Sequence, residues 1–129
     1  MHGSKQDVPV SMDMGGVVIR EVEWGDLNVA LESFPAGADS APIFKGLPDG
    51  RCQCPHWGYV ITGRLRVRYK EHEETLAAGD AYYLAPGHTT VFDEDTELVE
   101  FSPKGEYQKT IEVAARNVAA MRQHEEEPG

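Results

Sequence analysis

The stretch "RCQCPHWGYVITGRLRVRY", residues 51–69, decides the fold that the sequence predicts. Its second half alternates basic and apolar side chains, and the apolar members are Leu65, Val67 and Tyr69. Side chains two positions apart on a strand point to the same face of a sheet. The alternation therefore predicts a strand with an apolar inner face. We interpret the basic residues between as a solvated or interface face rather than a substrate site.

Short runs of β-branched and aromatic residues recur on both sides of this stretch, each bounded by a turn signal. They include "GVVIREVEW" and "LNVALESF", which the pair "GD" separates, and "AYYL", which lies between "GD" and "PG". A further run, "ELVEFS", follows the acidic turn "DEDT". Strands at such short and regular spacing indicate a sandwich or a barrel.

The pattern changes at the end of the chain, in "EYQKTIEVAARNVAAMRQHEEE". This segment places five apolar residues on one face of a helix with 3.6 residues per turn, namely Ile111, Ala114, Ala115, Val118 and Met121. We therefore expect one domain with four parts. They are a flexible N-terminal arm (1–14), a barrel (15–104), a C-terminal helix (105–123) and a disordered tail (124–129).

The net charge narrows the range of partners. The 129 residues include 12 Lys and Arg against 22 Asp and Glu, which gives a net charge of −10. A field of this sign repels phosphate backbones and anionic headgroups, so neither nucleic acid nor a membrane surface is an expected partner. No N-terminal apolar run resembles a signal sequence, and we expect a cytoplasmic protein whose two cysteines are thiols.

Two segments resemble the sequence motifs of the cupin superfamily, whose members are small β-barrels of two antiparallel sheets. They are "HWGYVITGRLRVRY" and, further along, "GDAYYLAPGHTTVF". The resemblance implies an all-β, antiparallel, jelly-roll-like barrel with one C-terminal α-helix. Cupins usually carry His-x-His and a Glu before the turn and a His after the second Pro-Gly. Here His56 stands in the place of the Glu, Cys52 and Cys54 lie upstream, and His88 directly follows Gly87.

Thiolate and imidazole groups are good ligands for zinc and other borderline divalent ions. The candidate metal ligands are therefore Cys52, Cys54, His56 and His88, and the expected cofactor is a divalent transition metal such as Zn, Fe or Ni. A straight strand from Cys52 to His56 spans about 13 Å, which is too far for both ends to bind one ion. Either the strand is bulged at Pro55 or Cys52 is not a ligand. We favour Cys54, His56 and His88, with Cys52 nearby and optional.

These four residues also have a purely structural interpretation. Free cysteines are often buried as small hydrophobic residues. His56 could be a core histidine bonded to a neighbouring carbonyl, and His88 a turn residue bonded to solvent.

Three functions stay open from the sequence. The first is a metal-dependent cupin that acts on a small polar molecule, with residues 36–50 as a lid. The second is a module that binds or senses a metal or metabolite without turning it over. The missing motif Glu, and the lack of an evident base near His56, favour it slightly. The third is a structural barrel with an empty cavity. We also expect a homodimer, because an aromatic and arginine-lined sheet face needs cover.

Overall fold

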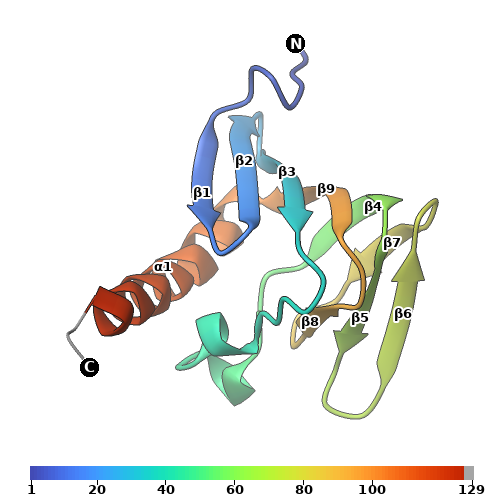
Figure 1. Ribbon diagram of the computed structural model, residues 1–129. Coiled ribbons are helices and arrows are strands. Elements are labelled where there is room, and N and C mark those ends of the chain that lie inside the picture. The colour runs from blue at the N-terminus through green and yellow to red at the C-terminus, as the bar shows by residue number, and fades with distance from the viewer. Residues whose placement is uncertain (127–129) are drawn as a thin grey trace.

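Two antiparallel sheets and one long helix make up the fold in the computed structural model, which describes residues 1–126 (Figure 1). The larger sheet has the strand order β1-β2-β3-β9-β4-β7, and the smaller sheet has the order β6-β5-β8. The strands are β1 (Val10–Met14), β2 (Val17–Trp24), β3 (Leu27–Phe34), β4 (His56–Thr62), β5 (Arg64–Arg68), β6 (Glu73–Ala77), β7 (Ala81–Leu84), β8 (Thr89–Phe92) and β9 (Thr96–Pro103). The predicted antiparallel β architecture with one C-terminal helix is confirmed.

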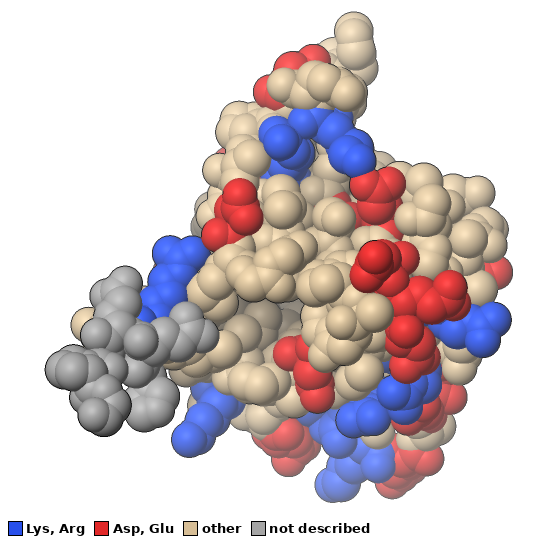
Figure 2. Space-filling view, viewed as in Figure 1, with Lys and Arg blue, Asp and Glu red and all other residues tan. Residues whose placement is uncertain are grey.

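Strand β5 shows the predicted alternation. Leu65 and Val67 are buried between the sheets, while the arginines face solvent and pair with acidic residues of β6 and the turn after β8. The ion pairs include Arg66 with Asp93 at 3.0 Å and Arg68 with Glu73 at 3.6 Å. Figure 2 shows blue and red side chains intermixed over this side of the molecule. The arginine face is therefore a solvated, charge-balanced surface.

The hydrophobic core lies between the two sheets. Its buried members come from both sheets: Val60, Leu65, Val67, Leu76, Tyr82, Leu84, Phe92 and Leu98. The rings of Phe34 and Phe92 stack against this core with their centroids 4.0 Å apart. Burial of these side chains at about 25 cal/mol per Å² of apolar surface is the main source of the stability of the barrel.

The turn between β4 and β5 requires the glycine of the "TG" pair. Gly63 has a φ of +93°, and a Cβ at this position would lie 2.3 Å from the carbonyl oxygen of Asp95. A side chain would clash with backbone that cannot move aside, and positive φ is costly for other residues. Gly63 therefore fixes the corner at which the chain passes from the larger sheet to the smaller one.

Helix α1 (Lys104–Glu126) packs beside the open end of the barrel and contacts the short 3₁₀ segment η1 (Ala41–Phe44). The Asn117 side-chain amide donates to the carbonyl oxygens of Ile43 and Lys45, at 2.8 and 2.9 Å. A second 3₁₀ segment, η2 (Pro48–Gly50), follows η1.

The helix differs from the prediction at both ends. It begins one residue earlier, at Lys104, and continues past residue 123 to Glu126, so it includes part of the predicted tail. The rest of that tail, residues 127–129, lies outside the described residues. On the predicted apolar face, Ala114 and Val118 are buried, but Ala115 is exposed. The helix meets the barrel along a narrower stripe than the sequence pattern suggested.

The N-terminal segment joins the fold earlier than the predicted boundary at residue 15. Strand β1 pairs with β2 along Val10–Met14, and a bulge interrupts the pairing between Val10 and Met12. Val8 is buried, and its carbonyl oxygen accepts a hydrogen bond from the Arg20 guanidinium at 3.1 Å. Backbone pairing holds this strand, and the bulge breaks the alternation by which such a strand is recognised.

Candidate metal centre

Cys52, four residues before the first cupin-like segment, pairs with His88 of the second segment. These residues form an isolated antiparallel bridge, in which the Cys52 amide donates to the His88 carbonyl oxygen at 2.8 Å. The Gly87 amide donates to the Cys52 carbonyl oxygen at 2.7 Å. The backbone thus fixes the residues just before the first segment against the turn of the second.

A thiol and two imidazoles come together just beyond this bridge. Cys52 Sγ lies 3.5 Å from His56 Nε2, and the ring centroids of His56 and His88 are 5.2 Å apart. One candidate ligand atom from each of the three residues lies within 4.8 Å of the others, and all three residues are buried. This is a compact set of one sulfur and two nitrogen donors facing the interior of the barrel.

Cys54 is not part of this cluster, although the sequence analysis preferred it to Cys52. Its thiol donates to the carbonyl oxygen of Pro55 at 3.4 Å, and it is fully buried. Regular strand geometry begins only at His56, so the alternation that placed Cys54 and His56 on one face does not hold upstream. The chain bends at Cys54, and Cys52 lies beside the two histidines.

Hydrogen bonds orient both imidazoles. His88 Nδ1 lies 2.7 Å from the carbonyl oxygen of Ala85, which can only accept, so this nitrogen carries the proton and Nε2 keeps its lone pair. His56 Nδ1 lies 2.6 Å from the Ser102 hydroxyl, and its Nε2 faces Cys52. Partners of this kind fix the ring and the tautomer of metal-binding histidines.

Burial sets the protonation of the cluster. It lowers the pKa of His88 to about 4, with a smaller contribution from His56, so this imidazole is neutral at pH 7. Burial also raises the pKa of the Cys52 thiol to about 12. The imidazole is therefore ready to donate its lone pair, whereas the thiolate form of Cys52 needs a cation beside it.

Two carboxyl groups lie next to the cluster, and the sequence analysis missed both. Glu100 Oε2 is 3.7 Å from His56 Nδ1, and Glu100 Oε1 accepts a hydrogen bond from the Tyr82 hydroxyl at 2.9 Å. Glu32 lies beside Glu100, and burial together with that neighbour raises its pKa well above the usual range. An acid thus stands near His56 after all, supplied by β9 rather than by the first cupin-like segment.

The cluster opens into a cavity of about 120 Å³ inside the barrel. Its wall includes Cys52, His56 and His88, together with Ile43 and Phe44 of the predicted lid. Further wall residues come from α1, namely Tyr107, Thr110, Ile111 and Ala114. Ile43 and Phe44 thus line the cavity, and the role of residues 36–50 as a lid stays a prediction.

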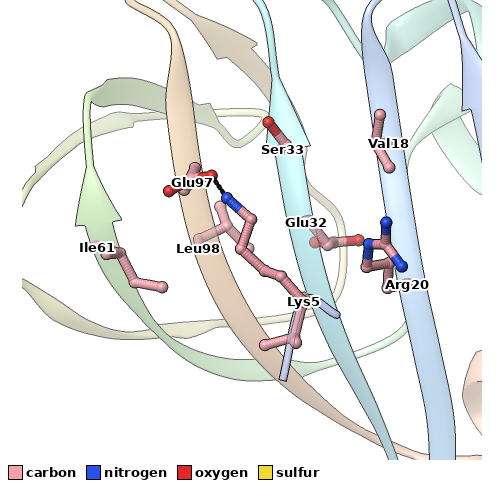
Figure 3. A pocket seen from close by; sticks show the side chains of 9 residues that line it. Lys5, Val18, Arg20, Glu32, Ser33, Ile61, Glu97 and Leu98 are labelled. Carbon is pink, nitrogen blue, oxygen red and sulfur yellow. Dashed lines mark hydrogen bonds and ion pairs between the residues drawn. The ribbon is translucent and has the colours of Figure 1, made fainter. Parts of the chain in front are cut away.

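A larger hollow, of about 290 Å³, lies on the outer side of β2, β3 and β9, away from the thiol and imidazoles. Figure 3 shows the Lys5 ammonium reaching across it to Glu97. Its other lining residues include Val18, Leu31 and Ile61. This hollow holds no thiol or imidazole, so we place the candidate site in the interior cavity.

The donor set fits a divalent transition metal. In a tetrahedral zinc site with one sulfur and two nitrogen ligands, neighbouring ligand atoms are about 3.3 to 3.8 Å apart. The observed Cys52–His56 separation of 3.5 Å falls in this range, and the upper limit of 4.8 Å for the whole set requires only a small side-chain adjustment. Cys52, His56 and His88 could therefore hold such an ion and leave a fourth position open to the cavity.

Comparison with solved structures identifies the fold. The chain is similar to an RmlC-like cupin from Shewanella frigidimarina, with a TM-score of 0.58 and 19% identity over 78% of this chain and 88% of that one. It is also similar to the polyketide cyclase RemF from Streptomyces resistomycificus, with a TM-score of 0.60 and 13% identity over 80% and 78% of the two chains. An oxalate decarboxylase variant from Bacillus subtilis matches with a TM-score of 0.56 and 18% identity over 79% of this chain and 30% of that one.

The chain therefore has the cupin fold, and the resemblance seen in its sequence motifs is confirmed. No family model matches the chain, and a search of curated proteins finds no relative. Within residues 1–126, no helix is long and apolar enough to cross a membrane. The predicted cytoplasmic location stays a prediction.

Proposed function

We propose that this protein is a metal-binding cupin that binds or acts on a small polar molecule in its barrel. The observation that carries the proposal is the buried cluster of Cys52, His56 and His88, whose ligand atoms lie within 4.8 Å of one another. An imidazole kept neutral by burial and a thiol at 3.5 Å from a second imidazole are donors without another evident task.

The residues around the cluster have distinct parts in this proposal. Ala85 and Ser102 hold the histidine rings so that both Nε2 atoms face the site. The walls of the barrel keep bulk water away from a bound molecule, which strengthens polar interactions inside. A bound divalent ion would supply Lewis acidity or oxygen activation at the open position.

The position of Glu100 supports an enzyme rather than a sensor. A carboxyl group 3.7 Å from His56 and beside the cavity can accept a proton from a bound molecule. This weakens the sequence-based preference for a non-catalytic module, which relied on the lack of such a group. The alternative of a metal- or metabolite-binding sensor is favoured by one observation. Glu100 already accepts the Tyr82 hydroxyl at Oε1 and lies against Glu32, so it is less available as a base, although Oε2 can still accept a hydrogen bond.

Metal analysis tests the proposal. Untagged protein should contain or take up about one divalent ion per chain, and a chelator should lower its melting temperature, because an ion that binds only the folded state stabilises it. His56→Ala should lose both effects. His2→Ala, at an exposed histidine, is the matched control and should keep both. A parent protein that binds no Zn, Fe or Ni and melts identically with chelator would refute the proposal.

The outer face of the larger sheet supports the proposed homodimer. Five large apolar side chains on β4, β7 and β9 are exposed: Trp57, Tyr59, Ile61, Tyr83 and Phe101. The Trp57 and Tyr83 rings lie 5.1 Å apart and form the centre of this aromatic patch. A chain with a net charge of −10 repels its own copies, and this uncharged patch is where self-association is least opposed. We therefore propose a second copy of the chain as its occupant.

A further inference from the structure

The charged side chains in the wall of the interior cavity are both acidic. Glu32 and Glu100 both contribute to its wall, on neighbouring strands β3 and β9. Among the residues that the structure describes, no lysine or arginine lines the cavity or the outer cleft that leads to it. A negatively charged ligand would therefore meet carboxyl groups without any cationic side chain to pair with.

The rest of the wall is mainly apolar. The cavity shares six residues with an outer cleft of about 360 Å³ that lies between the β1–β2 hairpin, residues 35–40 and helix α1, namely Met12, Ile19, Phe34, Ser40, Ile43 and Phe92. Five of these six are apolar, and Ser40 uses its hydroxyl to accept the Thr90 amide at 2.8 Å. A ligand that enters through this cleft therefore passes and then contacts aromatic and aliphatic side chains.

The size of the cavity limits the ligand. Apolar cavities of roughly 150 Å³ in proteins hold one benzene molecule. The interior cavity, at about 120 Å³, is slightly smaller and continues into the outer cleft. A molecule with a single ring, or an aliphatic chain of similar volume, is the largest that fits without rearrangement.

We propose that the cavity selects a small molecule with an apolar body and an N–H or O–H donor that carries no negative charge, and that Glu100 with Glu32 receives the donor. In the metal-free cavity, carboxylates and phosphates are rejected. The inference deepens the proposed function, because it names the class of molecule for the same cavity.

A charge count supports this selection with or without a metal ion. Within the described part of the chain, the wall of the metal-free cavity carries the two carboxyl groups of Glu32 and Glu100 and no lysine or arginine. A divalent ion held by one thiolate and two neutral imidazoles would add one positive charge near these carboxyl groups. An uncharged hydrogen-bond donor is compatible with both the metal-free and the metal-loaded cavity. A cationic ligand is compatible with the metal-free cavity. An anionic ligand could pair with a positive charge only at a bound metal ion.

Binding of three matched single-ring probes tests the inference on chelator-treated protein. The probes are benzyl alcohol, benzylammonium and benzoate, and binding is followed by NMR from contacts between probe protons and the rings of Phe34 and Phe92. We expect the alcohol and the ammonium to bind about tenfold or more tightly than benzoate, as a hydrogen bond to a charged group is worth about 1.5 to 3 kcal/mol. Benzoate binding as tightly as benzylammonium, or no binding by any probe, would overturn the inference.

Variants assign the selection to the carboxyl pair. Glu100→Gln with Glu32→Gln should reduce the preference for benzylammonium over benzoate by about tenfold, whereas Glu97→Gln, outside the cavity wall, should leave it unchanged. An unchanged preference in the double variant would refute the role of the pair. Because the assay uses metal-free protein, its result is independent of the metal analysis. Selective binding of the probes without metal uptake would refute only the proposed function. Metal uptake without selective binding of the probes would refute only this inference.

Discussion

His88 should make the metal-free protein sensitive to mild acid. Burial lowers the pKa of its imidazole from 6.5 to about 4, and the residue is only 2% exposed, so solvent screens it little. As pH falls below about 6.5, the unfolded chain takes up a proton at His88 and the folded chain does not, which favours unfolding. The difference between the two pKa values corresponds to about 3 kcal/mol in total, of which about 2 kcal/mol is lost between pH 7 and pH 5.

Urea denaturation at pH 7, 6 and 5 in the presence of a chelator measures this loss. His88→Asn cannot be protonated in this range and can still donate to the Ala85 carbonyl oxygen, so it removes the titration while keeping the hydrogen bond. The parent should lose about 2 kcal/mol more than the variant between pH 7 and pH 5. Equal losses in the two proteins would show that the imidazole is not held neutral by burial, and the reasoning about the site would fail with it.

Three further outcomes are expected. Glu32→Gln should raise the free energy of unfolding, and this gain should grow from pH 5 to pH 8. The reason is that the raised pKa of Glu32 in the folded state makes folding less favourable once the carboxyl of the unfolded chain ionises. A gain that shrinks as pH rises would contradict this. Leu65→Ala should cost about 2 to 5 kcal/mol in urea denaturation, whereas Ile61→Ala, at an exposed position, should cost under about 1 kcal/mol. Sedimentation should show a dimer that Trp57→Ser with Tyr83→Ser converts to monomer, and a monomeric parent would refute the aromatic interface.

The strands were predictable because their residues alternate. The runs ending at Trp24 and Phe34 coincide with the ends of β2 and β3, and the buried Leu65 and Val67 follow from side-chain parity alone. Strand β1 was not predicted. A bulge between Val10 and Met12 interrupts its pairing with β2, so its side chains do not alternate regularly between the two faces of the sheet.

The candidate site was only partly predictable. His56 and His88 were named from their places in the two motifs, and the structure brings them together with Cys52 rather than Cys54. The choice between the cysteines depended on whether residues 52–56 are extended, which is a tertiary property fixed by the bridge between Cys52 and His88. Glu100 could have been found, because it shares inward parity on β9 with the buried Leu98 and Ser102.

Cobalt binding to cysteine variants tests the central claim most directly. Co²⁺ replaces Zn²⁺ in tetrahedral sites, and a bound thiolate gives it a charge-transfer absorption band that nitrogen and oxygen ligands do not. The parent and Cys54→Ser should bind one Co²⁺ with this band, while Cys52→Ser should lose the band and bind more weakly, because only Cys52 lies beside both histidines. A band that survives in Cys52→Ser and disappears in Cys54→Ser, or a parent that binds no Co²⁺, would contradict the proposed metal centre.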